Sequence, residues 1–189
     1  MPALEQNILH TSIKDISKSL DAFDVFIETG TLHGETSRMA SPLFKKVYTI
    51  EVYEPLYQKA YTSFQNTNVE VILGDSTLQL PTLLPKIDSN IVFWLDGHNS
   101  GPGTGVGAID FPLLEECRII DSYFKGEEAL ILVDDVRLFG VGHSVGIDDS
   151  LKTITVDQVL NSFSKRSVIS YHYYDSSFSL QDRLAIYIK

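Results

Sequence analysis

Short apolar, β-branched runs alternate along the chain with longer segments of helical spacing. Five runs are typical of buried strands, at residues 25–27, 47–50, 69–73, 91–95 and 129–133. Between them, residues 54–64 and 109–120 place apolar side chains three or four positions apart, which predicts amphipathic helices. Residues 1–22 show the same spacing and predict a helix before the first strand.

This alternation predicts an α/β fold. Strand, helix and strand in succession form right-handed crossovers, so the strands become parallel and helices cover both faces of the sheet. Two later strand-like segments, residues 168–174 and 183–188, are separated by a polar turn at 175–177. We therefore expect a Rossmann-like three-layer sandwich, with a mostly parallel seven-stranded sheet and an antiparallel C-terminal strand pair.

A single domain accommodates these elements. The expected parts are an N-terminal helix in residues 1–22, a binding core in 23–136, and an acceptor-side segment with the closing strands in 137–189. A chain of 189 residues, with 43% hydrophobic and 21% charged residues, is long enough to bury a core of its own.

The charge balance narrows the choice of partners. Fifteen Lys and Arg residues against 25 Asp and Glu give a formal net charge of −10, which disfavours nucleic acid and leaves small molecules. The single cysteine, Cys117, has apolar neighbours at helical spacing and is expected to be buried. No apolar run is long enough to span a membrane and the N-terminus is not signal-like, so a cytoplasmic protein is expected. A homodimer is left open.

Polar or glycine-containing segments follow the apolar runs, at the edge of the sheet where open α/β proteins bind ligands. After the first run, Gly30 and Gly34 predict a turn whose backbone comes close to a ligand before a helix begins. Their G-x-x-x-G spacing lacks the third glycine of dinucleotide-binding turns. Glu28, shortly before the turn, either pairs with a cationic ligand or caps the turn.

Acidic residues after both of the first two runs, Glu28 and Glu51, fit an adenosine ligand without phosphates, and Asp75 is a separate candidate at the adenine. Glu51 ends the second run, where a carboxylate accepts hydrogen bonds from ribose hydroxyls. Asp75 follows the third run and either accepts a hydrogen bond from the adenine amino group or caps the next helix, a role that also suits Ser76.

A second group of carboxylates predicts a metal site. Asp96 follows the fourth run, and Asp134 and Asp135 follow the fifth, so neighbouring strands would bring them to one edge of the sheet. Carboxylates so close are costly unless a cation neutralises them, and oxygen ligands suit Mg²⁺ or another hard divalent cation. The alternative is that each aspartate only caps a turn.

His98 adds a candidate base two residues after Asp96. Its imidazole can accept a substrate proton or bind a softer metal, and a solvated or hydrogen-bonded side chain is the alternative. His143 is a weaker candidate. The glycine-rich segment 99–107 is either a lid over the substrate or a flexible connection, and it lacks the G-K-[ST] ending of a phosphate-binding loop.

These motifs resemble a known family. Five segments fall in the order of the class I S-adenosylmethionine (SAM)-dependent methyltransferases, at residues 26–31 (FIETGT), 49–51 (TIE), 74–76 (GDS), 93–98 (FWLDGH) and 131–136 (ILVDDV). The likeness covers about residues 26–136 and is nearest to the metal-dependent O-methyltransferases, including the catechol type. Those enzymes share an L-D pair, a helix reading L-L-E-E-C and a strand ending in D-N, which correspond here to residues 95–96, 113–117 and 134–135.

The resemblance implies roles for the motif residues. Those implied at the cofactor are Glu28, Gly30, Thr31, Gly34 and Thr36 around the methionine part and its turn, Glu51 at the ribose, Asp75 and Ser76 at the adenine, and Asp96. The implied Mg²⁺ ligands are Asp96, Asp134 and Asp135. The metal would bind two acceptor oxygens and acidify one hydroxyl, while the protein orients the acceptor.

The chain also departs from the catechol type. Those enzymes have a lysine base shortly after the first metal aspartate, whereas this chain has Gly97, His98 and Asn99, so His98 and Asp96 are the expected catalytic residues. The expected activity is Mg²⁺-dependent O-methylation of a small-molecule hydroxyl, such as that of a sugar or natural product. Two alternatives stay open: a SAM- or nucleoside-binding protein without transfer activity, and a metal-dependent hydrolase or hydroxylase-like protein that uses His98, Asp96 and Asp134.

Overall fold

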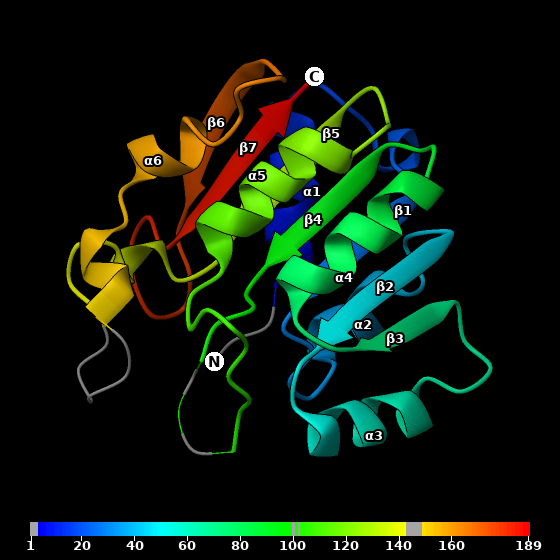
Figure 1. Cartoon of the computed structure of the whole chain (residues 1–189). Coiled ribbons are helices and arrows are strands. Elements are labelled where there is room, and N and C mark those ends of the chain that lie inside the picture. Colours follow the sequence, from blue (N-terminus) through cyan, green and yellow to red (C-terminus); the bar gives the residue numbers. More distant parts are fainter. Residues whose placement is uncertain (1–3, 100, 102, 143–148) are drawn as a thin grey trace.

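The computed structural model describes residues 4–99, 101, 103–142 and 149–189 (Figure 1). Its strands are β1 (Val25–Thr29), β2 (Lys46–Glu51), β3 (Val69–Leu73), β4 (Ile91–Leu95), β5 (Ala129–Val133), β6 (Val168–Tyr174) and β7 (Arg183–Ile188). Its α-helices are α1 (Gln6–Asp15), α2 (Glu35–Ala40), α3 (Glu54–Ser63), α4 (Ser76–Leu83), α5 (Leu113–Tyr123) and α6 (Val156–Leu160). Short 3₁₀ turns lie at Leu20–Ala22, Leu84–Lys86, Val136–Leu138 and Asp149–Thr153.

The strands form one seven-stranded sheet in the order β3-β2-β1-β4-β5-β7-β6. Strands β1 to β5 are parallel, while β7 runs antiparallel to both β5 and β6. The predicted fold class, with its antiparallel closing pair, is confirmed. The strand order reverses between β1 and β4, and such a reversal opens a crevice at the carboxyl ends of the two strands.

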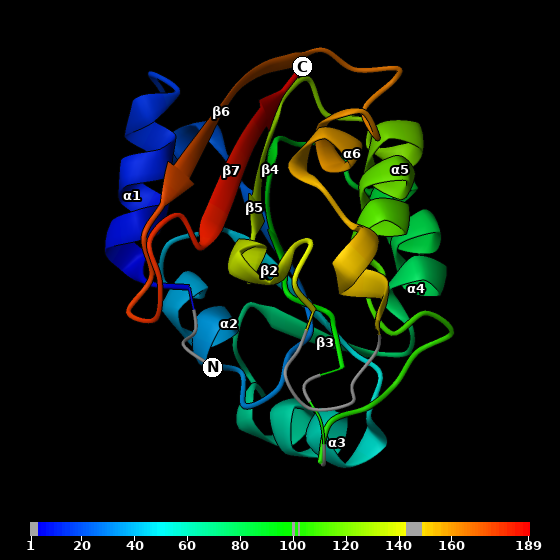
Figure 2. The ribbon, with the colours of Figure 1, turned by 90° about the vertical axis from the view of Figure 1, so that its left-hand side faces the viewer.

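Helices cover both faces of the sheet, with α1 on one side and α4, α5 and α6 on the other (Figure 2). Paired residues of neighbouring strands point to the same face. Ile27, Phe93 and Ile131 are in register and belong to the core cluster that includes α4, α5 and α6. Their neighbours Phe26 and Val92 belong to the cluster on the side of α1, α2 and α3. Both faces of the central strands are buried, which explains their continuous apolar runs.

Two helices are shorter than their apolar spacing suggests. The N-terminal helix ends at Asp15, because Ser17 takes a left-handed backbone (φ 58°). Helix α5 begins four residues later than the spacing at 109–120 indicates, since Pro112 disfavours helical backbone in the residue before it. Residues 109–112 are instead part of the loop that leads into α5. Cys117 is buried in α5, as expected. Across the described residues, no helix is both long and apolar enough to cross a membrane.

Candidate active site

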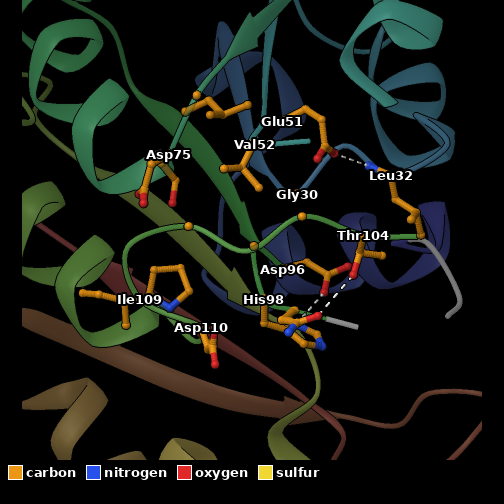
Figure 3. A pocket seen from close by; sticks show the side chains of 18 of the residues that line it. Gly30, Leu32, Glu51, Val52, Asp75, Asp96, His98, Thr104, Ile109 and Asp110 are labelled. Atoms are coloured by element: carbon orange, nitrogen blue, oxygen red, sulfur yellow. Dashed lines mark hydrogen bonds and ion pairs between the residues drawn. The ribbon is translucent and has the colours of Figure 1, made fainter. Parts of the chain in front are cut away.

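A pocket opens at the carboxyl ends of β1 to β4, where the strand order predicts it (Figure 3). It spans about 640 Å³, counted with the open solvent at its mouth. Its remaining wall comes from the loop between β4 and α5. The residues expected at the cofactor that line this pocket are Gly30, Glu51, Asp75, Ser76 and Asp96.

The two glycines of the turn are required by contacts within the protein. Gly30 has a left-handed backbone (φ 83°), and a Cβ atom there would lie 2.4 Å from the carbonyl oxygen of Asp96. Gly34 is also left-handed (φ 71°), and its Cβ would lie 2.8 Å from Cε2 of Phe64. Of the pair, only Gly30 lines the pocket. The packing of the Phe64 ring, rather than the approach of a ligand, therefore explains the second glycine.

Glu28 lies behind the turn and outside the pocket lining. Its side chain is buried, and Oε2 accepts hydrogen bonds from Ser37 Oγ (2.6 Å) and Thr49 Oγ1 (2.7 Å). Burial raises the pKa of Glu28 to about 8, although these hydrogen bonds oppose the shift. The carboxyl group is mostly protonated near neutral pH and joins β1 to α2 and β2.

The threonines of the turn also bond within the protein. Thr31 Oγ1 lies 2.6 Å from Thr49 Oγ1, and Thr36 Oγ1 accepts a hydrogen bond from the backbone N–H of Leu4 (3.1 Å). Neither threonine is in the pocket lining. Together with Glu28 and Gly34, they shape the turn from behind, so the glycine turn meets the pocket through Gly30 and Leu32.

Glu51 is fixed at the pocket by two backbone groups. Its Oε2 accepts a hydrogen bond from Leu32 N (2.9 Å), and its Oε1 accepts one from Tyr53 N (2.9 Å). The side chain is buried at the end of β2 and lines the pocket. Each carboxylate oxygen keeps a further lone pair, so the arrangement suits a pair of ligand hydroxyls such as those of a ribose.

Asp75 caps helix α4, which settles one of its two expected roles. Oδ1 accepts hydrogen bonds from the backbone N–H and the hydroxyl of Thr77 (2.8 and 2.6 Å), and Oδ2 accepts one from Ala108 N (2.7 Å). Burial opposes ionisation, but these hydrogen bonds prevail and lower the pKa of Asp75. Ser76 is the first residue of the helix rather than its cap. The Ala108 contact places the end of the glycine-rich loop beside Asp75.

The described part of this loop crosses the pocket. A Cβ atom on Gly105 would lie 2.7 Å from Cγ1 of Val52, and one on Gly107 would lie 2.5 Å from Oδ2 of Asp75. Glycine therefore allows the backbone to lie directly on the pocket wall. The segment expected to be a lid lines the pocket through Asn99, Thr104, Gly105 and Gly107, and its residues 100 and 102 lie outside the described part of the chain.

His98 lies between two of the predicted aspartates. Its Nδ1 is 3.4 Å from Asp96 Oδ1, and its Nε2 is 3.2 Å from Asp135 Oδ2. Burial alone would lower the pKa of the imidazole, but its contacts with the two carboxylates raise the pKa to about 10. His98 is therefore protonated near neutral pH in this arrangement, and in that state it cannot accept a proton. His143, the weaker candidate, lies outside the described residues.

Two arginines form ion pairs with the acidic edge, the group of carboxylates made up of Asp96, Asp134 and Asp135. Arg183 Nε lies 3.1 Å from Asp134 Oδ1. Arg137 Nη1 contacts Asp135 Oδ1 and lies 2.7 and 2.8 Å from the two oxygens of Asp182. The predicted crowding of carboxylates is present, and the protein supplies cations of its own to offset it.

One oxygen of each predicted metal ligand still lacks a hydrogen bond. Asp96 Oδ1, Asp134 Oδ2 and Asp135 Oδ2 are buried without one, apart from the ion-pair contacts with His98. Ligand atoms of Asp96, His98 and Asp135 lie within 4.8 Å of one another, as do those of Asp134, Asp135 and Asp182. Asp135 also holds a left-handed backbone (φ 58°) while buried, a strain that is typical of functional sites. Each of these two groups offers three ligands to a divalent cation, and the predicted set of Asp96, Asp134 and Asp135 is divided between them.

Sequence reasoning missed Arg137, Asp182 and Arg183. Asp182 and Arg183 come at the start of β7, which is antiparallel to β5, so they reach the end of β5 where Asp134 and Asp135 lie. The predicted closing pair carried a usable signal: a strand that runs antiparallel to β5 must begin at its carboxyl end. The sequence could therefore have placed Asp182 and Arg183, at the beginning of this strand, near Asp134 and Asp135.

Comparison with known proteins gives matches in structure only. No family model matches the chain, and no curated protein matches it. The chain is similar in structure to an rRNA methylase from Streptococcus thermophilus, with 15% identity, a TM-score of 0.56, and coverage of 100% of this chain and 98% of that one. It is also similar to an S-adenosylmethionine-dependent methyltransferase from Clostridium acetobutylicum, with 10% identity, a TM-score of 0.59, and coverage of 98% and 92%.

A third similar structure contains a ligand. It is a candidate methyltransferase from Streptococcus mutans in complex with S-adenosylhomocysteine (SAH), with 19% identity, a TM-score of 0.58, and coverage of 100% and 98%. At this level of identity the likeness concerns the fold. The seven-stranded mixed sheet with antiparallel β5, β7 and β6 is the Rossmann-like fold of these proteins.

Proposed function

We propose that this chain is a SAM-dependent methyltransferase that acts on a hydroxyl group of a small molecule. The observation that carries the proposal is the position of Glu51, which is fixed by two backbone N–H groups at the mouth of a pocket at the β1–β4 reversal. The likeness of the fold to methyltransferases, one of them in complex with SAH, supports the same cofactor.

The pocket residues divide the binding of SAM between them. Glu51 would accept hydrogen bonds from the ribose hydroxyls, and Asp75 and Ser76 face the side assigned to adenine. Gly30 leaves room for the methionine part, because it has no side chain. Figure 3 shows Glu51 and Asp75 toward one end of the pocket and Asp96 and His98 toward the other. SAM supplies a methyl group on a positively charged sulfur, and we assign the acceptor to the end with Asp96 and His98.

Asp96, Asp134 and Asp135 would hold Mg²⁺ or another divalent cation only in a state in which His98 holds no proton between Asp96 Oδ1 and Asp135 Oδ2, because these are two of the three buried oxygens that would bind the ion. Such an ion would bind an acceptor oxygen and lower the pKa of its hydroxyl. The side chains of Arg137 and Arg183 reduce the need for an ion, because they already offset the charge of the aspartates. The dependence of methyl transfer on a divalent cation is therefore measured in the same experiment as the transfer itself.

Deprotonation of the acceptor then involves Asp96 and His98, the two members of the acidic edge that line the pocket. Burial raises the pKa of Asp96, which makes this carboxylate a stronger proton acceptor than an exposed aspartate. His98, which keeps its proton, donates to Asp96 and Asp135 and fixes their orientation.

A second candidate function is favoured by the grouping of Asp96, His98 and Asp135. Two carboxylates and one histidine with ligand atoms within 4.8 Å of one another offer mixed oxygen and nitrogen ligands to one divalent cation, with one histidine fewer and one carboxylate more than the set of iron oxygenases. A metal-dependent hydroxylase-like protein would use this set, with a neutral His98. It would bind Fe²⁺ and would not transfer a methyl group.

Transfer of labelled methyl groups tests the first function against the second. The protein is incubated with methyl-labelled SAM and a panel of sugars, catechols and other polyhydroxylated small molecules, with Mg²⁺ or with a chelator. Label in an ether-linked methyl group is expected for at least one acceptor class, and a chelator that abolishes it assigns a role to the metal. The absence of labelled product over the whole panel, with Fe²⁺-dependent oxidation of an acceptor instead, favours the second function.

A further inference from the structure

The pocket is rich in negative charge. Its lining includes the carboxylates of Glu51, Asp75, Asp96 and Asp110, and contains no lysine or arginine among the described residues. The basic side chain in the lining is His98, which already contacts two carboxylates. Such a wall disfavours an anionic ligand and favours a cationic one.

Another carboxylate lies directly behind this wall. Glu116 in α5 is 1% exposed, and its Oε1 makes no hydrogen bond within the described residues. A Cβ atom on Gly97, which lines the pocket, would lie 3.2 Å from that oxygen. Because Gly97 has no side chain, only backbone separates Glu116 from the pocket wall. The neighbouring polar side chains are the hydroxyls of Thr29 and Ser76, so no cation of the chain pairs with Glu116 among the described residues.

An acid in this position is costly for the fold. Burial raises the pKa of Glu116 to about 7, and the nearby hydroxyls of Ser76 and Thr29 only partly oppose that shift. A glutamine would occupy the same volume without the cost of a buried charge. A carboxylate at Glu116 is favoured over an amide if a bound ligand places a positive charge near it, because no cation of the described residues does so.

We propose that Glu116 is a specificity-determining residue of this pocket, and that its carboxylate favours a ligand with a positive charge over a neutral ligand of the same shape. The inference rests on the proposed function, in which the ligand is SAM. SAM carries a sulfonium, whereas its demethylated product, SAH, carries an uncharged thioether. The negative wall therefore retains the methyl donor and weakens the hold on the product, which favours release of SAH after transfer.

The test measures binding rather than turnover. Isothermal titration calorimetry at about pH 8.5, above the pKa of about 7 of Glu116, compares SAM, SAH and sinefungin, an analogue in which a protonated amine replaces the sulfonium. The variant is Glu116→Gln. The matched control is Glu115→Gln, which removes an adjacent acid of α5 that is exposed and paired with Arg118.

We expect Glu116→Gln to weaken SAM and sinefungin about tenfold and SAH less than about threefold, because only the charged ligands lose an attraction. Glu115→Gln should leave all three affinities unchanged. Equal weakening of all three ligands by Glu116→Gln would mean a structural role and would overturn the proposal, as would unchanged affinities.

The wild-type protein gives a second measurement that does not depend on the folding of the variant. It should bind SAM and sinefungin more tightly than SAH, and equal affinities would contradict the charge selection even if Glu116→Gln proved unstable. Failure of the proposed function is distinguishable, because in that case the wild-type protein binds none of the three ligands.

Discussion

Replacement of Gly30 by alanine separates the two demands on this position, its left-handed backbone and its close approach to β4. A left-handed backbone costs a residue with a side chain about 1–2 kcal/mol. The added Cβ would also lie 2.4 Å from the carbonyl oxygen of Asp96, so the ends of β1 and β4 must move apart. Overpacking of this kind costs about 1–3 kcal/mol more. The total expected loss of unfolding free energy is about 2–5 kcal/mol.

Gly140→Ala is the matched control, because Gly140 has a similar backbone (φ 75°) and no described atom lies within 4 Å of its Cβ position. Thermal unfolding of both variants measures the difference. We expect Gly30→Ala to lower Tm by about 2–12 °C more than Gly140→Ala, since 1 kcal/mol corresponds to about 2–4 °C in a domain of this size. Gly30→Ala should also weaken SAM binding, because Asp96 is displaced. Equal losses of Tm in the two variants would refute the steric argument.

Three further perturbations test other parts of the account. For Glu28, the folded-state pKa of about 8 exceeds the ordinary value of 4.5, so the folded state keeps a proton that the unfolded state releases, and stability falls as pH rises between these values. Glu28→Gln should flatten this fall in denaturant titrations, and an unchanged slope would contradict the assignment. Arg137→Met should lower the unfolding free energy by about 2–4 kcal/mol, because it removes the cation that the buried carboxylates of Asp135 and Asp182 share, whereas Arg118→Met, at an exposed pair, should cost less than about 0.5 kcal/mol. Similar losses in a urea titration would be evidence against the pairing. Asp134→Ala should abolish Mg²⁺-stimulated methyl transfer and leave SAM affinity within about twofold, since Asp134 is outside the pocket lining; a stimulated rate like that of the wild type would remove it from the metal site.

Much of the fold could be predicted from local pattern. The apolar runs of β1, β4 and β5 are buried on both faces, so their sequence carries the signal of a central parallel strand. The polar turn before β7 likewise indicated the antiparallel closing pair. The placement of Asp75 and Glu51 at the pocket followed from the same logic, because residues after parallel strands gather at one edge of the sheet.

Side-chain direction and long-range pairing could not be predicted in this way. Glu28 and Gly30 are two residues apart, yet Gly30 lines the pocket while Glu28 bonds to α2 and β2 behind it. Arg137 and Arg183 meet the acidic edge only because β7 pairs with β5. Glu116 is part of the L-L-E-E-C segment at residues 113–117, which was identified only as a helix. Its position behind the pocket wall depends on how α5 packs against the sheet. These contacts arise from tertiary packing, which the local sequence pattern does not reveal.

Calorimetric titration of SAM into the wild-type protein and into Glu51→Ala tests the central claim most directly. We expect one SAM to bind per chain with a dissociation constant on the order of micromolar, and Glu51→Ala to weaken binding at least about tenfold through loss of the hydrogen bonds to the ribose. The control Glu54→Ala, at an exposed acid of α3, should bind SAM as the wild type does. No binding of SAM to the wild-type protein, or equal affinity in Glu51→Ala, would contradict the account.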